Sequence, residues 1–208
     1  MSQSPAQQKL IIIDGNALLH RAWHALPQTM KIENGTLTNA AYGFTTILLK
    51  ALQDIHPSHI VVCFDAPGKT FRDKMYKEYK ATRKKQPQEL YDQIPIIQEI
   101  LDSLNIPYYQ KKGVEADDVI ATLVEHAKKQ KGLKTVVVSG DMDLLQLVGE
   151  NVEVYTPKRG ITEMGVYDTE AVKERYDGLM PEQLADFKGL RGDPSDNIPG
   201  ATGIGEKT

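Results

Sequence analysis

Three short apolar runs in this chain each lead into an acidic residue, and this pattern restricts the possible folds. The runs are residues 10–13, 60–64 and 135–138, and the acids that follow them are Asp14, Asp65 and Asp141. Runs this short and this rich in Ile and Val, separated by helical patterns, are typical of buried strands in a parallel sheet. Parallel strands end at the same edge of a sheet, where ligands bind in open α/β folds. The pattern therefore predicts an α/β fold with a mostly parallel central sheet and acids along one edge.

Segments with the apolar spacing of helices separate these runs. We expect helices from about residue 17, then at about 38–54, 88–104, 117–129, 143–148, 168–176 and 181–190. A short strand is expected from 107, and a strand pair at 152–155 and 161–166. Alternating strands and helices predict helices on both faces of the sheet.

The composition suits a protein of the cytoplasm. Cys63 is the only cysteine, which excludes an internal disulfide and favours a reducing compartment. The first nine residues are polar and the apolar run after them has four residues. That run is too short for a signal peptide or a membrane span, so we expect a cytoplasmic protein with no membrane association.

Charge is distributed unevenly along the chain. The net charge is −3, yet residues 69–85 contain eight basic residues and two acids, so the remainder carries −9. Phe71, Tyr76 and Tyr79 lie among these basic residues. Cations can follow phosphates while aromatic rings stack on unpaired bases, so the segment indicates a polyanionic substrate. A solvated helix with paired charges is the alternative interpretation of this segment.

Six further acids occur in clusters. Asp143 lies two residues after Asp141, a group of three opens the helix at 117, and a pair lies in a Gly/Pro-rich loop: Glu115, Asp117, Asp118, Asp193 and Asp196. Any one of them could be a helix cap or a turn residue. Nine acids converging on one cleft would repel one another unless cations bound there, and purely oxygen ligands suit Mg²⁺ or Mn²⁺.

Two other enzyme classes fit less well. A haloacid-dehalogenase-like phosphotransferase needs a second acid at position 16, where this chain has Asn16. A Walker A loop needs Lys directly after its second Gly, where Glu206 stands. The Gly-rich stretch 200–208 instead suggests backbone amides that hold a DNA phosphate at a helix N-terminus, with Gly203, Gly205 and Lys207 as its DNA-binding residues.

Taken together, these motifs resemble the 5′ nuclease (flap endonuclease-like) family, in particular the 5′→3′ exonuclease domain of bacterial DNA polymerase I. The resemblance covers nearly the whole chain, in order. It is carried by Ile-Asp14-Gly-Asn, Cys-Phe-Asp65, Tyr79-Lys80-Ala-Thr-Arg83, Glu115-Ala-Asp117-Asp118, Ser-Gly-Asp141-Met-Asp143 and Gly-Asp193-Pro-Ser-Asp196-Asn-Ile-Pro-Gly. It implies a PIN-like catalytic domain over residues 1–178 with a helical arch at about 68–88. Residues 179–208 would then begin a helix-hairpin DNA-binding element, and the natural chain would continue into polymerase domains.

The resemblance also implies roles for individual residues. Asp14, Asp65, Glu115 and Asp117 would hold a first divalent ion, and Asp118, Asp141, Asp143, Asp193 and Asp196 a second. Lys80 and Arg83 would contact the scissile phosphate, with Tyr79 near the threaded 5′ strand. The DNA-binding residues would be Arg21, Arg72, Lys74, Lys77 and Lys84, and a potassium ion would bind the helix-hairpin if that element were complete.

The expected activity is that of a two-metal-ion phosphodiesterase that trims 5′ ends and 5′ flaps of nicked or branched DNA in replication and repair. Two alternatives remain open at this stage. A PIN-like RNA nuclease would share the acids, and a non-catalytic DNA-binding module would need only the basic segment.

Overall fold

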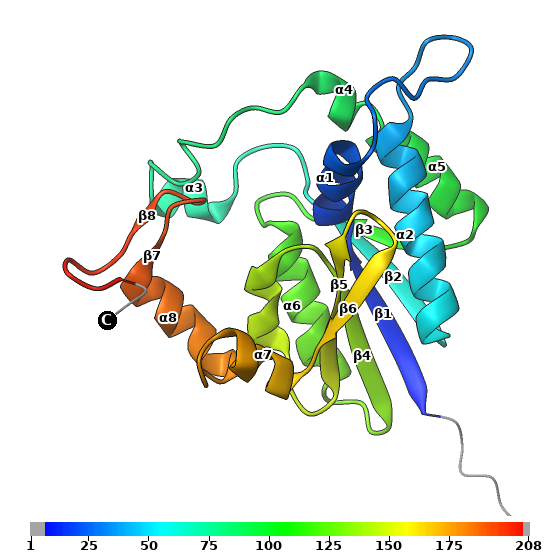
Figure 1. Ribbon diagram of the computed structural model, residues 1–208. Coiled ribbons are helices and arrows are strands. Elements are labelled where there is room, and N and C mark those ends of the chain that lie inside the picture. The colour runs from blue at the N-terminus through cyan, green and yellow to red at the C-terminus, as the bar shows by residue number, and fades with distance from the viewer. Residues whose placement is uncertain (1–6, 206–208) are drawn as a thin grey trace, which may run out of the picture.

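A six-stranded sheet forms the centre of the computed structural model, which describes residues 7–205 (Figure 1). The strands are β1 (Gln8–Asp14), β2 (His59–Phe64), β3 (Tyr108–Gln110), β4 (Leu133–Val138), β5 (Val152–Arg159) and β6 (Glu163–Tyr167). Their order in the sheet is β3-β2-β1-β4-β5-β6, and β6 pairs antiparallel with β5 while the other pairs are parallel. The predicted α/β class and mostly parallel sheet are therefore confirmed.

Helices cover both faces of this sheet. One face packs against α1 (Gly15–Ala25), α2 (Asn39–Ile55) and α5 (Ile94–Ser103). The other packs against α6 (Ala116–Ala127), the 3₁₀ helix η1 (Met142–Leu147), α7 (Thr169–Arg175) and α8 (Leu184–Arg191) (Figure 1). Within residues 7–205, no helix is both long enough and apolar enough to cross a membrane.

Alternating side chains of β1 show why this sequence is buried on both faces. Ile11 and Ile13 belong to the core on the α2 side, whereas Ile12 belongs to the core on the α6 side. All three are fully buried, because successive residues of a strand point to opposite faces. A continuous apolar run is therefore needed here, rather than the alternation of a strand with one solvated face.

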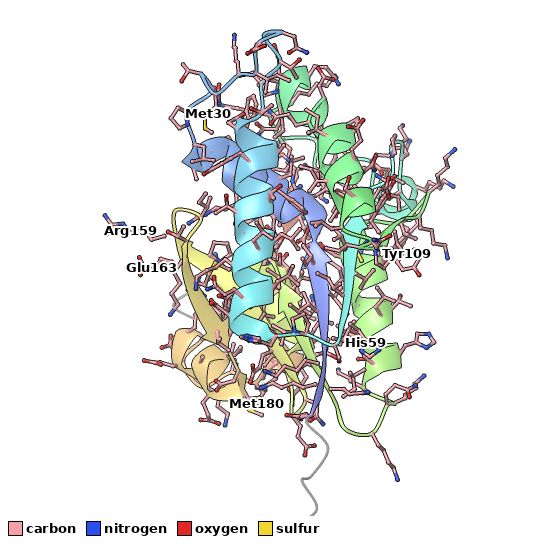
Figure 2. The ribbon with its side chains drawn as sticks, turned by 90° about the vertical axis from the view of Figure 1, so that its right-hand side faces the viewer. Met30, His59, Tyr109, Arg159, Glu163 and Met180 are labelled. Carbon is pink, nitrogen blue, oxygen red and sulfur yellow. The ribbon has the colours of Figure 1, made fainter. Side chains whose placement is uncertain are left out.

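The strand register brings the acids to one edge. Asp14, the last residue of β1, pairs with Cys63 of β2, and Ile13 pairs with Val138 of β4. Asp65 and Ser139 consequently leave the sheet beside Asp14. In a side view, Met30, on the chain beyond α1, and His59, at the start of β2, lie at opposite ends of the molecule (Figure 2). The acids lie at the carboxyl ends of the strands, where α1 begins.

Two expected helices differ in detail. The predicted helix 88–104 is divided into α4 (Gln88–Tyr91) and α5, which has Pro95 in its first turn. Proline lacks an amide hydrogen and is favoured at a helix start, so it begins a new helix here rather than continuing the old one. The segment 143–148 is confirmed as helical but forms the 3₁₀ helix η1.

The helical arch expected at about 68–88 is largely not helical. It contains α3 (Phe71–Met75), and turns and loop follow up to α4. Tyr76 has extended backbone angles, and Lys80 has a positive φ of 55°. Lys80 is also three residues from Lys77 and four from Lys84, and like charges at these spacings destabilise a helix.

The C-terminal region of the described chain, residues 179–205, contains α8 and three shorter elements. Its elements are η2 (Pro181–Gln183) before α8 and a small hairpin of β7 (Gly192–Asp193) and β8 (Ile198–Pro199) after it. Turns occupy residues 202–203, and Lys207, predicted to bind DNA, lies outside the described residues. The boundary predicted at 178/179 and the helix-hairpin element remain predictions.

Candidate active site

The end of β1 fixes Asp14 in a buried position. Its carboxylate caps α1 by accepting a 2.9 Å hydrogen bond from the Ala17 amide, and it accepts a second, 2.7 Å bond from the Ser139 hydroxyl. The same Ser139 hydroxyl accepts a 2.9 Å bond from the Asp141 amide. Asp14 and Asp141, which are far apart in sequence, are thereby linked through one serine at the ends of adjacent strands.

Asp65 joins the end of β2 to the start of α6. Its carboxylate accepts a 2.7 Å hydrogen bond from the Ala116 amide, and its own amide donates a 2.8 Å bond to the Asn16 side chain. A carboxylate is favoured at a helix N-terminus, where free amides point outward. This contact holds the acidic first turn of α6 against the edge of the sheet.

The first turn of α6 directs its three acids differently. Asp118 folds back to accept a 3.0 Å bond from the Glu115 amide and two bonds, of 2.6 and 2.8 Å, from the Arg72 guanidinium. Glu115 faces Lys80 and Tyr79. The Asp117 carboxylate makes no hydrogen bond or ion pair with any of residues 7–205, and it faces the acids at the strand ends.

These groups line one open cleft of about 1510 Å³. Seven of the nine predicted metal ligands border it: Asp14, Asp65, Glu115, Asp117, Asp141, Asp143 and Asp196. Lys80, Arg83 and Lys84 line the same cleft. Asp118 and Asp193 are not among its lining residues, and their carboxylates bond to Arg72 and Lys188. Acids and cations thus share a single cleft at the carboxyl ends of the strands.

The two acids with the most strongly raised pKa values, Asp117 and Asp14, have no basic partner among residues 7–205. Burial, and after it the charges of Asp14, Asp141, Asp65 and Glu115, raise the pKa of Asp117 to about 8. Burial raises the pKa of Asp14 to about 6 despite its two hydrogen bonds. Uncompensated carboxylates in a cleft are the arrangement that a bound cation would relieve.

Basic side chains of the protein already pair with the other acids. Lys80 lies 2.9 Å from Glu115, Arg83 pairs with Asp196, and Lys188 bridges Asp143 and Asp193. Asp14, Asp65, Asp117 and Asp141 have no such partner among residues 7–205. The nine acids therefore divide into four unpaired and five paired groups. Within the described residues, no three acidic, histidine or cysteine side chains are close enough to enclose an ion as they stand.

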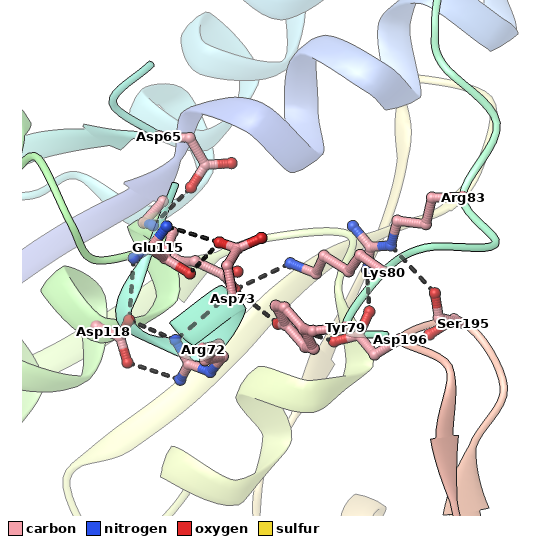
Figure 3. A network of polar contacts seen from close by, with 12 residues as sticks. Asp65, Arg72, Asp73, Tyr79, Lys80, Arg83, Glu115, Asp118, Ser195 and Asp196 are labelled. Carbon is pink, nitrogen blue, oxygen red and sulfur yellow. Dashed lines mark hydrogen bonds and ion pairs between the residues drawn. The ribbon is translucent and has the colours of Figure 1, made fainter. Parts of the chain in front are cut away.

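The basic segment lies over the acids and contacts them directly (Figure 3). Tyr79 is only 9% exposed, and its hydroxyl donates 3.1 Å bonds shared between Glu115 and Asp196. Burial and these two carboxylates raise the pKa of Tyr79. Its ring is therefore enclosed, whereas Phe71 and Tyr76 are the aromatic residues of this segment that face solvent.

The predicted DNA-binding residues are more dispersed. Arg21 and Lys84 line the cleft, and the Arg21 side chain donates a 2.9 Å bond to the Gly160 carbonyl. Arg72 is held by Asp118. Lys74 and Lys77 are exposed outside the cleft, as are Gly203, with a φ of 86°, and Gly205. Two of these predicted DNA-binding residues therefore line the cleft, and a third, Arg72, pairs with one of the acids.

Three residues in the site have no role in the sequence analysis. Ser139 and Asn16 could have been suspected, because each lies next to a strand end that carries an acid. Lys188 gave no signal, because it is a single lysine in a helix 45 residues from Asp143, and only the fold brings the two together.

The family model for the 5′-3′ exonuclease, N-terminal resolvase-like domain, matches residues 9–177. DNA polymerase I of Bacillus subtilis is 49% identical over 202 residues, which are 97% of this chain. DNA polymerase I of Chloroflexus aurantiacus is 48% identical over 95% of the chain. The chain spans 23% and 21% of the lengths of these two relatives, so the similarity concerns one part of each.

Solved structures agree on the fold. A crystal structure of a bacteriophage T5 flap endonuclease with DNA and metal ions is similar with a TM-score of 0.76 and 23% identity, covering 96% of this chain and 72% of that one. A second bacteriophage T5 structure, of the 5′-exonuclease with zinc, has a TM-score of 0.73 and 24% identity over the same shares. The matched residues, the fold and the acidic cleft lead to one conclusion: the chain belongs to the 5′-3′ exonuclease family and carries its N-terminal, resolvase-like nuclease domain.

Proposed function

We propose that this domain is a metal-dependent 5′ nuclease that hydrolyses DNA phosphodiesters at 5′ ends and 5′ flaps. Family membership supports the nuclease class. The observation that carries the metal dependence is the group of four unpaired acids, Asp14, Asp65, Asp117 and Asp141, at the strand ends of one cleft. Cations that line the same cleft beside these acids suit a phosphate backbone.

The donor set fits hard divalent ions. All nine predicted ligands are carboxylates, and such oxygen-only sets favour Mg²⁺ or Mn²⁺ over Zn²⁺. We propose two ions, the first held by Asp14, Asp65, Glu115 and Asp117, and the second by Asp118, Asp141, Asp143, Asp193 and Asp196. Bound there, the ions would supply an activated water and stabilise charge on the leaving oxygen.

Residues of the basic segment would bind and orient the substrate. Lys80 and Arg83 line the cleft beside the acids, where they pair with Glu115 and Asp196. Oxygens of a phosphate that enters the cleft can replace these carboxylates as partners of the two cations. Fixed cations aimed at a phosphoryl group offset the charge that develops there during hydrolysis. Arg21 and Lys84, on the same cleft, would hold neighbouring phosphates.

The natural setting is part of the same proposal. The relatives matched are DNA polymerases I, so we propose that this domain works in a longer chain with polymerase domains, removing primers and repair flaps in the cytoplasm. A potassium ion at a completed helix-hairpin would strengthen its grip on duplex DNA.

Cleavage of a labelled 5′-flap duplex tests the function. We expect cleavage with Mg²⁺, none with EDTA, and a loss of at least 100-fold in rate for Asp141→Asn. Asp186→Asn in α8 is the matched control, because that acid is exposed and outside the cleft.

Other outcomes would redirect the assignment. Cleavage of single-stranded RNA in preference to the flap would indicate an RNA nuclease. Magnesium-independent DNA binding with no cleavage would indicate a binding module. Full activity of Asp141→Asn would remove that acid from the proposed ligands.

A further inference from the structure

The loop after β7 is fastened to the basic segment. The Lys80 amide donates a 2.9 Å hydrogen bond to the Asp196 carbonyl, and the Asn197 side-chain amide donates a 2.7 Å bond to the Glu78 carbonyl. These partners are more than 110 positions apart in sequence. We call this set of contacts between residues 78–83 and 195–197 the latch.

The latch also fixes the side chains nearest the acids. Arg83 donates a 3.2 Å bond to the Ser195 carbonyl and pairs with Asp196, while Tyr79 bonds to both Asp196 and Glu115 (Figure 3). Lys80, between them, is thereby placed with its ammonium 2.9 Å from Glu115. The position of the two cations over the cleft thus depends on the loop 195–197.

Asn197 is suited to this task. Its backbone has a φ of 58° and that of Lys80 a φ of 55°, so both sides of the latch are turns in the left-handed region. Asparagine tolerates this region better than most residues, and its amide supplies the donor that the Glu78 carbonyl accepts. Asn197 is uncharged, so replacing it with another uncharged residue removes none of the charged groups of the cleft.

We propose that Asn197 is a positioning residue that locks the turn carrying Tyr79, Lys80 and Arg83 over the acidic cleft. Its hydrogen bond couples the C-terminal loop to the cations that would contact the scissile phosphate. The consequence for cleavage rests on the proposed function, whereas the consequence for the conformation of the basic segment does not.

Asn197→Gly removes the side-chain hydrogen bond without adding backbone strain, because glycine adopts positive φ freely. Asn105→Gly is the matched control, since Asn105 has a φ of 53°, is exposed, and lies after α5 outside the cleft. With the metal-free protein, we expect trypsin to cut after Lys80, Arg83 and Lys84 at least fivefold faster in Asn197→Gly than in Asn105→Gly. Hydrogen exchange at the Lys80 amide should accelerate by a similar factor.

Flap cleavage supplies the second readout. Under single-turnover conditions with Mg²⁺, we expect Asn197→Gly to slow cleavage about five- to tenfold, the effect of one lost hydrogen bond, while the Kd for the flap changes less than twofold. Asn197→Asp keeps the shape and the backbone preference but cannot donate to a carbonyl. Because its added charge can itself weaken DNA binding, we compare it in the trypsin and exchange measurements, where it should behave like Asn197→Gly.

The outcomes separate the two proposals. Equal trypsin and exchange rates in Asn197→Gly and Asn105→Gly would overturn the latch, as would wild-type behaviour of Asn197→Asp. A wild-type protein that fails to cleave DNA, with the trypsin difference retained, would reject the proposed function and leave the latch. If Asn197→Gly fails to fold, the trypsin and exchange measurements on Asn197→Asp decide the question.

Discussion

Asp117 is surrounded by acids and has no basic partner within residues 7–205. Its raised pKa of about 8 means that the folded protein holds a proton there that the unfolded chain releases near its ordinary pKa of 3.8. That proton stabilises the fold fully below pH 4, and the stabilisation is lost as the pH rises through 8. We expect a divalent cation bound in the cleft to replace this proton.

The free energy of unfolding of the metal-free protein should therefore fall between about pH 4 and pH 8. Asp117→Asn removes the titrating group with the higher raised pKa and should make the decline shallower between pH 6 and pH 8, while Asp14, whose pKa is raised to about 6, still contributes below pH 6. Saturating Mg²⁺ should flatten the whole decline in the wild-type protein. Urea unfolding at a series of pH values, with EDTA or Mg²⁺, measures both effects.

Asp186→Asn serves as the control and should retain the wild-type slope, because the acid is exposed. An unchanged slope between pH 6 and pH 8 in Asp117→Asn would show that other groups dominate the titration there.

Individual acids were predictable from the sequence, but their partners were not. A carboxylate at the end of an apolar run can be recognised in the sequence alone, as Asp14 and Asp65 were. The Lys188 bridge between Asp143 and Asp193, and the burial of Tyr79 between Glu115 and Asp196, arise from packing among distant segments. A local pattern contains no information about such pairs.

Elements with a strong apolar period were predicted most closely. β1, β2 and β4 were found because buried parallel strands need continuous runs. The helix expected at about 168–176 is α7, which Asp168 caps. The basic segment was predicted as a helical arch, yet most of it is turns that contact a loop more than 110 residues away. Long-range contacts decided that conformation over local helix preference.

The junction between β1 and α1 allows a prediction about how these two elements pack. Gly15 is buried directly after Asp14, and a Cβ there would lie 2.3 Å from the Phe64 ring. The ring is fully packed in the core, so Gly15→Ala must displace it or shift α1. We expect a loss of about 1–3 kcal/mol in the free energy of unfolding by urea.

Gly149→Ala is the control for this substitution, since a Cβ there meets nothing within 4 Å and no positive φ is required. A change of less than about 0.5 kcal/mol for Gly15→Ala, within the range of ordinary surface substitutions, would show that the ring moves freely.

Over the whole molecule, charge is separated despite a net value of −3. The basic segment, with Lys74 and Lys77 exposed on it, extends this positive character beyond the cleft. Each phosphate neutralised by a lysine releases counterions, so binding to DNA should weaken steeply with salt.

Lys77→Ala should therefore reduce the slope of log K against log salt by about one for a flap duplex. Lys131→Ala is the comparison, because Lys131 precedes β4 at the opposite edge of the sheet. Fluorescence anisotropy at several salt concentrations, in EDTA to prevent cleavage, measures the slopes. Equal slopes for both variants would place Lys77 outside the DNA contact.

The acidic cleft is lined by residues that range in sequence from Asp14 to Asp196, almost the whole described chain. During synthesis, the emerging polypeptide contains Asp14 and Asp65 long before the loop that carries Asp193 and Asp196 leaves the ribosome. Until then, neither the full set of acids nor the contacts that hold Lys80 and Arg83 over them can form. On the proposed function, an incomplete chain would therefore lack the contacts that hold Lys80 and Arg83 over the acids and should cleave DNA slowly.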